Sequence, residues 1–254
     1  MLREGKRNWK EYFIEFLMLF AAVSLGFLAE NYRDELNEEK QAVELAYSLY
    51  NDVYEDSARL EDFKETKFRQ IVTYDSLRDL LSTPNWKNKI ADLYRIHTAL
   101  MVRQTFSPRE GTIQQLKNSG GLRYFKDTAL VNRIEHYEAA KQVIRVRVER
   151  EQTLMFNYLD PLIIRFIDMD AIHKNQTFYG PVVGTPTNGD YQKLKPYPAD
   201  TRMLHQEEFD PIYYRNIFSL LNVNRSTDSR VFAGSAIQSA KELRAYLRDK
   251  FDFE

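Results

Sequence analysis

An uninterrupted apolar run near the N-terminus constrains this 254-residue chain more than any other feature. Residues 13–29 read FIEFLMLFAAVSLGFLA, and Glu15 is the only ionisable side chain among them. As a helix these residues span about 25 Å, a little less than the hydrocarbon core of a bilayer. Tyr12 and the stem of Lys10 can extend the apolar length. The run therefore predicts one transmembrane helix over residues 12–32.

The residues that flank the run predict its orientation. Trp9, Tyr12 and Tyr32 lie where interfacial aromatic anchors are found, and Lys10 lies beside the first of them. Basic residues are concentrated ahead of the run, at Arg3, Lys6, Arg7 and Lys10. Because Lys and Arg near the ends of a span favour the cytoplasmic side, residues 1–11 are expected in the cytoplasm and residues 33–254 outside it.

Two other interpretations of the run remain open. A cleaved signal peptide is one, because residues 22–24 (AVS) resemble a small-residue cleavage site. Apolar residues continue past that point, however, through Leu25, Phe27 and Leu28. A buried core helix is the other, although such helices usually have shorter apolar runs.

Small and polar residues inside the run predict a neighbour in the membrane. Ala22 and Gly26 form a small-xxx-small pair, with Ser24 nearby, and such a face lets a second helix approach closely. Glu15 lies near the cytoplasmic edge, where its carboxylate either snorkels or pairs with an adjacent helix. The expected partners are the lipid bilayer and another membrane protein or a second copy of the chain.

The remaining sequence predicts a mainly α fold, in which the transmembrane helix is followed by an antiparallel helical bundle. Residues 30–81 contain no Pro or Gly and show helical apolar spacing. Pro84 is expected to restart a helix to about residue 103. Further helices are expected over 112–119, from 127 or 128 to about 172 with a kink at Pro161, over 211–221, and from 226–228 to about 250. Partial alternation leaves a strand open at 143–148.

One long Pro/Gly-rich loop, residues 173–200, interrupts the helical pattern. It holds four of the eight prolines, and Asn188-Gly189 indicates a short hairpin. Long loops often carry recognition residues, although a passive connection fits the same composition. The recognition candidates are Tyr179, Pro181, Pro186, Tyr191 and Tyr197.

A glycine turn in the centre of the chain favours a structural role. Gly120 or Gly121 can adopt the positive φ that ends a helix, and Ser119 and Asp127 can cap. Contact with a ligand or partner is the alternative for this turn.

Residue types argue against several classes of function. The net charge of −1 disfavours nucleic-acid binding, and the absence of cysteine excludes thiol chemistry and disulfides. Two acidic groups could bind a divalent cation, but each is more simply a solvated polar cluster: His205 with Glu207, Glu208 and Asp210, and Asp168 with Asp170 and His173. Arg145, Arg147 and Arg150, interleaved with Glu149 and Glu151, are interpreted as surface ion pairs. No cofactor, metal or catalytic residue is predicted, so we expect no enzyme.

Several segments resemble a family of uncharacterised bacterial single-pass membrane proteins, defined as a domain of unknown function. Residues 7–10 (RNWK), 15–17 and 25–31 (LGFLAEN) resemble its anchor. Residues 112–123 (TIQQLKNSGGLR), 126–130 and 134–137 resemble its central motif. The resemblance implies a bacterial inner-membrane protein with a helical periplasmic domain, and it implies no reaction.

Together these features predict a non-enzymatic interaction or scaffold protein of the cell envelope. The alternative is an extracytoplasmic ligand-sensing module. Because only about a dozen residues precede the span, such a sensor is expected to signal through a partner subunit.

Overall fold

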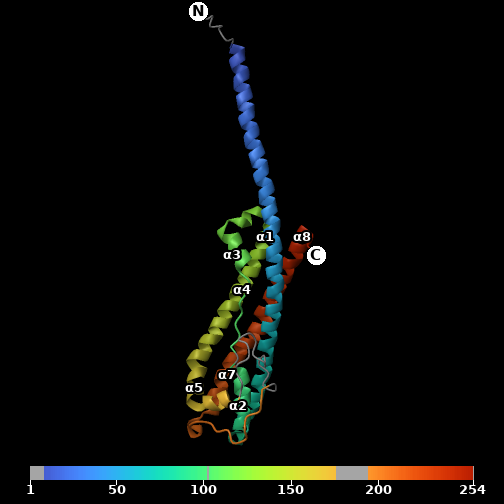
Figure 1. Cartoon of the computed structure of the whole chain (residues 1–254). Coiled ribbons are helices and arrows are strands. Elements are labelled where there is room, and N and C mark those ends of the chain that lie inside the picture. Colours follow the sequence, from blue (N-terminus) through green and yellow to red (C-terminus); the bar gives the residue numbers. More distant parts are fainter. Residues whose placement is uncertain (1–8, 102, 176–193, 254) are drawn as a thin grey trace, which may run out of the picture.

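The computed structural model describes residues 9–101, 103–175 and 194–253 (Figure 1). The fold is mainly helical, as the sequence predicts, with 84% helix and no strand in the described part. The stretch 143–148, where a strand was left open, lies inside a helix.

A single helix, α1 (Trp9–Ser82), runs over 74 residues. It joins the apolar run and the following amphipathic stretch without a break, since no Pro or Gly interrupts residues 27–82. At 1.5 Å per residue it is about 110 Å long. Its first buried residue is Ala42, so the helix projects far beyond the rest of the molecule (Figure 1).

Shorter elements follow α1: η1 (Trp86–Asn88), α2 (Ile90–Leu100), α3 (Gly111–Asn118) and η2 (Gly121–Tyr124). The prediction that a helix begins at Pro84 was wrong about where the helix starts. The Trp86 amide instead donates to the Thr83 carbonyl (3.2 Å), and the buried Trp86 indole begins a 3₁₀ turn. The α-helix therefore starts at Ile90.

The next helix contains a π-turn. α4 (Thr128–Leu154), η3 (Met155–Leu159) and α5 (Asp160–Phe166) follow one another directly. Pro161 lies in the first turn of α5, beside the π-turn, at the position where a kink was expected. Ile167 has an extended backbone and separates α5 from α6 (Met169–Asn175). The helix that was expected to reach residue 172 therefore ends at Phe166.

The C-terminal part is likewise one continuous helical path. After η5 (Gln206–Glu208), α7 (Pro211–Thr227), η6 (Asp228–Phe232) and α8 (Ala233–Phe251) succeed each other, with η6 a second π-turn. Asp228 has helical dihedral angles rather than capping a new helix. The prediction that residues 226–228 begin a separate helix was wrong, because the Asp228 carboxylate accepts from Arg147 instead of from the backbone.

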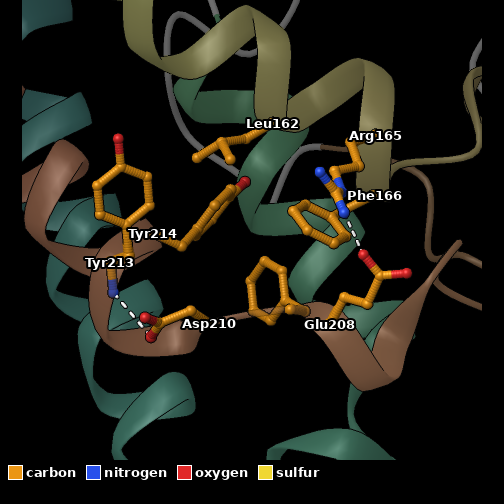
Figure 2. A pocket seen from close by; sticks show the side chains of 8 residues that line it. Leu162, Arg165, Phe166, Glu208, Asp210, Tyr213 and Tyr214 are labelled. Atoms are coloured by element: carbon orange, nitrogen blue, oxygen red, sulfur yellow. Dashed lines mark hydrogen bonds and ion pairs between the residues drawn. The ribbon is translucent and has the colours of Figure 1, made fainter.

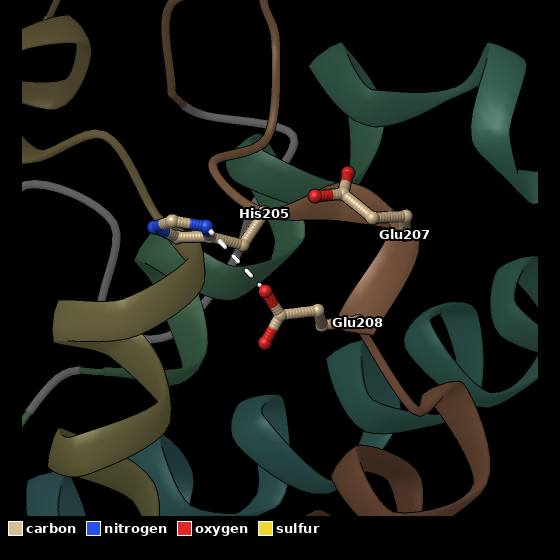
Figure 3. Close-up of side chains that lie close together, drawn as sticks. All are labelled: His205, Glu207 and Glu208. Carbon is tan, nitrogen blue, oxygen red and sulfur yellow. Dashed lines mark ion pairs between the residues drawn. The ribbon is translucent and has the colours of Figure 1, made fainter.

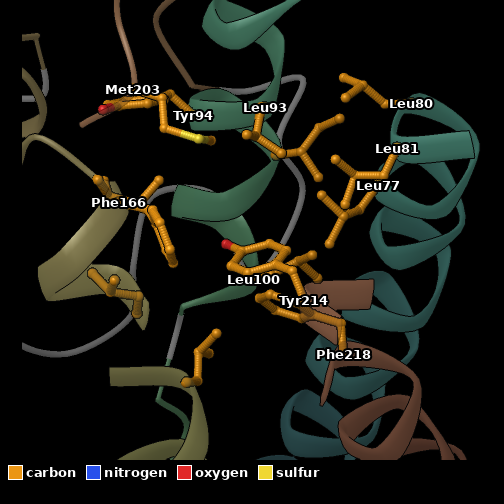
Figure 4. Close-up of a cluster of buried hydrophobic side chains, with 14 of the residues drawn as sticks. Leu77, Leu80, Leu81, Leu93, Tyr94, Leu100, Phe166, Met203, Tyr214 and Phe218 are labelled. Atoms are coloured by element: carbon orange, nitrogen blue, oxygen red, sulfur yellow. The ribbon is translucent and has the colours of Figure 1, made fainter. Parts of the chain in front are cut away.

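Hydrogen bonds along its length tie this path to α1, among them the Tyr74–Ser219 hydroxyl pair. Arg215 donates to Ser82 (2.7 Å), Ser229 to the Lys64 carbonyl (3.2 Å) and Arg244 to Tyr50 (3.0 Å). α4 packs in turn on α8. The largest apolar cluster fills the end of the molecule opposite the N-terminus and includes Leu77, Leu93, Phe166, Tyr214 and Phe218 (Figure 4).

Candidate functional site

None of the residues in the apolar segment of α1 is buried, and all of them except Ser24 are exposed. Its most apolar window of 18 residues has a mean hydropathy of 2.0, and none of it is buried. Leu19 and Val23 are 67% and 51% exposed. These values contradict a buried core helix, and they fit either a membrane anchor or a signal sequence.

The expected packing residues lie on that exposed surface. Ala22 and Gly26 are one turn apart on α1, and a Cβ built at Gly26 meets nothing within 4 Å. Glu15 is also exposed, and Ser24 is half-buried. A second helix could therefore approach the small-residue face without displacing any part of this chain.

The expected interfacial residues mark the two ends of the segment. Trp9 begins α1 and stacks on Phe13 at 5.6 Å between ring centroids. Lys10 and Tyr12 are exposed beside it, and Tyr32 is exposed at the other end. Trp9, Tyr12 and Tyr32 remain 76%, 55% and 65% exposed, so the described chain covers little of these aromatic side chains.

The glycine turn has a structural explanation at each position. Gly120 adopts φ +67°, Gly121 begins η2, and Ser119 donates to the Gln115 carbonyl (2.6 Å). Asp127 caps α4 by accepting from the backbone amide of Ala129 (2.9 Å). Its carboxylate also accepts from Lys250 and Tyr246, and these bonds hold the Asp127 pKa well below its ordinary value.

Most of the predicted recognition loop lies outside the described residues, including Tyr179, Pro181, Pro186, Tyr191 and the expected hairpin. Tyr197 is described, and its assignment as a recognition residue was wrong. Its side chain is only 6% exposed, its hydroxyl bonds to Thr98 (3.0 Å) and its ring packs on Tyr94. The loop was also expected to start at residue 173, but residues 173–175 belong to α6.

A buried ionic network was not expected from the sequence. Lys67 of α1, Glu151 of α4 and Arg225 of α7 are almost completely buried. The Arg225 Nε donates to Glu151 Oε1 (2.8 Å), and the Lys67 ammonium pairs with the other Glu151 oxygen. Arg225 also donates to the Leu100 carbonyl (3.1 Å), so the network joins three long helices and the end of α2.

The network continues to the two π-turns. Arg147 donates to Asp228, the first residue of η6 (2.7 Å), and to Asn224 (3.0 Å). Glu151 lies one turn before η3. π-turns are often found at functional sites, and here both lie beside buried charges. The interpretation of Arg147 and Glu151 as surface ion pairs was wrong, since both point into the molecule.

Opposing charges control protonation in this network. Burial raises the pKa of Glu151, but the Arg225 and Lys67 cations outweigh it and lower the pKa to about 2. Burial also lowers the pKa of Lys67 and raises that of Asp228. Glu151 therefore remains ionised at neutral pH, and its carboxylate joins basic side chains from two different helices.

A pocket of about 230 Å³ opens at the end of the molecule opposite the N-terminus (Figure 2). α5 contributes Leu162, Arg165 and Phe166, and the segment from Glu208 to Tyr214 contributes the remainder. Across the pocket, the Arg165 guanidinium pairs with the Glu208 carboxylate.

Beside the pocket, ligand atoms of His205, Glu207 and Glu208 lie within 4.8 Å of one another (Figure 3). All three side chains are exposed, and Glu208 is already paired with Arg165. Asp210 does not join them, because its carboxylate caps α7.

The second acidic group is also used structurally. Asp168 accepts from the amides of Asp170 (2.9 Å) and Ala171 (3.2 Å) at the start of α6. Among the described residues, His205, Glu207 and Glu208 are therefore the acidic group whose ligand atoms lie close together, and all three are exposed.

Comparison of the chain with protein-family models, characterised proteins and solved structures finds no match. The resemblance to the uncharacterised membrane-protein family therefore stays a prediction.

Proposed function

We propose that this chain is a single-pass, membrane-anchored interaction protein of the bacterial cell envelope that performs no catalysis. One observation carries the proposal: an apolar segment with no buried residue and a core-forming segment belong to the same uninterrupted helix. Water does not tolerate such a length of exposed Leu, Phe and Val side chains, whereas a bilayer does.

The proposed topology places residues 1–11 in the cytoplasm, 12–32 in the inner membrane and 33–254 in the periplasm. The excess of basic residues before the span supports this direction. The exported part is an antiparallel bundle, supported by the hydrogen bonds in which rising residue numbers on α7–α8 meet falling numbers on α1.

Another membrane helix or a second copy is the proposed partner within the bilayer. The open face around Ala22 and Gly26 supports close approach. Glu15 is the residue that a neighbouring polar side chain would recognise.

Membrane fractionation tests the proposal. The full-length protein is expected to stay with membranes after alkaline carbonate washing, and protease added to spheroplasts is expected to digest the region after Tyr32. The mature mass distinguishes an anchor from a signal peptide, because cleavage near residue 24 removes Met1–Ser24. A soluble or cleaved product contradicts the anchor, and protection from protease reverses the topology.

A ligand-sensing module that signals through a partner is a second candidate. It is favoured by the pocket and by the continuity of α1, which joins the apolar segment to the core at the far end. Identical partner cross-linking with and without a bound ligand would contradict it.

A further inference from the structure

An exposed apolar row continues along α1 beyond the proposed transmembrane segment. Between residues 33 and 54, four large apolar side chains are 46–57% exposed: Leu36, Val43, Tyr47 and Tyr54. Their spacing of seven, four and seven residues places them within about 40° of one another around the helix, since each residue advances about 100°. Buried Leu49 lies about 140° around the helix from Leu36. The row therefore faces away from the packed side of α1.

Contacts within the chain hold two of these rings in place. The Phe253 ring meets the Tyr47 ring edge-on, with centroids 5.4 Å apart, and the Arg244 guanidinium lies 4.4 Å from the centroid of the Tyr54 ring. Each tyrosine is nevertheless more than half exposed, so these contacts orient the ring without covering it. A side chain that is already held in one position loses little freedom when a partner packs on it.

The same spacing extends back into the apolar segment. Steps of seven residues from Val43 through Leu36 reach Ala29, Ala22 and Glu15, and these last three are exposed. Glu15 is the only ionisable residue of the apolar run, and such residues in a membrane helix usually face protein rather than lipid. A seven-residue repeat keeps one side of a helix against a partner helix when the two supercoil. We name this line of residues, from Glu15 to Tyr54, the α1 seam.

The bilayer limits which partner matches the α1 seam. Under the proposed topology, on which this inference rests, every copy of the chain crosses the membrane in the same direction and to the same depth. Two adjacent copies therefore present each seam residue at the same height as its own counterpart, about 6 Å beyond Tyr32 for Leu36 and about 33 Å for Tyr54. Such a pair has a twofold axis along the membrane normal, and its apolar residues meet identical apolar residues.

The charges along the seam are compatible with self-pairing. Two basic residues, Arg33 and Lys40, also lie on this side of α1. Arg33 pairs with Glu30 of its own chain (3.6 Å), and Lys40 is flanked by the exposed carboxylates of Glu39 and Glu44. In a parallel coiled coil, acidic residues beside the seam of one helix lie within reach of a lysine in the seam of the other. A single lysine of this kind also fixes the register of the two helices.

We infer that the chain forms a parallel dimer with a second copy of itself, and that the α1 seam is the interface. The two α1 helices lie at the centre of the dimer, and the packed parts point away from each other because the core lies on the opposite side of α1. The next seam position after Tyr54 is Glu61, which pairs with Lys241 of the same chain (3.7 Å). The apolar interface therefore ends at Tyr54.

Single cysteines test the interface directly, because the chain has no cysteine of its own. Leu36→Cys and Val43→Cys should each form a disulfide-linked dimer when native membranes are oxidised with copper phenanthroline. Gln41→Cys is the matched control, since Gln41 is exposed and two residues from Val43 but lies about 160° away around the helix. Its yield of linked dimer should be about tenfold lower, because a disulfide requires closely spaced Cα atoms.

Charge reversal tests whether Val43 meets its own counterpart. In the Leu36→Cys background, Val43→Arg and Val43→Glu should each lower the yield of linked dimer about fivefold, because like charges then face each other. Coexpression of the two variants with different tags should restore the mixed dimer, since opposite charges then face each other. A different partner protein at the seam would give no such restoration.

Equal yields for Val43→Cys and Gln41→Cys, linkage to a protein of different mass, or no recovery in the mixed pair would each overturn the dimer. Carbonate washing of the same membranes separates this result from the proposed function. A chain that stays in the membrane without linking contradicts the dimer alone, whereas a chain absent from the membrane contradicts the anchor and the dimer together. Far-ultraviolet circular dichroism of each purified variant verifies that it is folded.

Discussion

The two halves of α1 follow opposite rules. Residues 9–41 expose large apolar side chains and bury none of their residues, whereas residues 42–82 bury Leu49, Val53 and Leu60 and even bury the charged side chains of Asp56 and Lys67. The helix is the same, so its backbone does not explain the contrast. The surroundings do: the second half has helices packed on it, and the first has none in the described chain.

This contrast shows that exposure and polarity need to be considered together. Exposed leucine side chains in the first half require an apolar environment outside the described chain. A buried lysine in the second half requires an oppositely charged partner inside the fold. The partner of Lys67 is Glu151, which lies 84 positions away in the sequence. Two tests bear directly on this comparison, and two more examine the part of the molecule packed on the second half.

Charges in the first half should have the largest effect. The double change Leu19→Arg, Val23→Arg places two cations at the middle of residues 12–32, at about 2.5–3.5 kcal/mol each on insertion scales. Loss of the protein from the membrane fraction is expected, while the packed part of the molecule, residues 42–253, keeps its helical content. Val43→Arg is the matched control, because Val43 is 46% exposed against 51% for Val23. If Val43→Arg releases the protein as readily, the first half is not special.

In the second half, removing a buried charge should destabilise the fold itself. Glu151→Gln leaves Lys67 and Arg225 without their shared carboxylate, and breaking such a buried pair costs about 3–5 kcal/mol. Urea unfolding of the full-length protein in micelles measures it. Glu149→Gln, at an exposed position on the same helix, should change the free energy of unfolding by less than about 0.5 kcal/mol. Equal effects would place Glu151 at the surface.

A third test uses acid. Burial lowers the pKa of His97 to about 3 from an ordinary 6.5, so the unfolded chain takes up this proton first as the pH falls. The stability contributed by neutral His97 is complete above pH 6.5 and is lost down to pH 3, with a slope of about 1.4 kcal/mol per pH unit. His97→Gln should remove that slope between pH 6.5 and 4.5. A variant that keeps the full slope would show that other groups cause the acid sensitivity.

The smallest change in stability is expected at a glycine, and a second glycine is its control. Gly120→Ala should cost about 1 kcal/mol, because an alanine there must adopt φ +67° although nothing lies within 4 Å of its Cβ. An alanine at residue 26 has equal space and needs no positive φ, so Gly26→Ala should leave the melting temperature unchanged. Thermal unfolding followed at 222 nm compares them. A Gly120→Ala variant as stable as wild type would contradict the strained turn.

Local chemistry made part of the fold predictable from the sequence. The apolar run, the Asp127 cap and a positive φ at Gly120 or Gly121 each depend on a few neighbouring residues, and the structure contains all three, with the positive φ at Gly120. The helical start proposed at residues 226–228 failed for the opposite reason. Asp228 has the side chain of a cap, but Arg147, 81 residues away, binds it.

The rest of the candidate site depends on residues distant in the sequence. Glu151 resembles its exposed neighbour Glu149 until α1 and α7 bring Lys67 and Arg225 to it. The pocket forms only where α5 meets the start of α7, since Leu162, Arg165 and Phe166 line one side and residues 208–214 the other. Tyr197 was misassigned because a proline-rich composition gives no sign that a side chain reaches the core.

The continuity of α1 also has a mechanical meaning. A rigid rod pivoting at the bilayer surface amplifies small angular changes in proportion to its length. Residues 33–82 extend about 75 Å, so under the proposed topology a change of about 10° in the inclination of the anchor would sweep the distal end sideways by about 13 Å. Lipid thickness or a neighbouring protein that alters this inclination would then decide what the distal end of the molecule can reach.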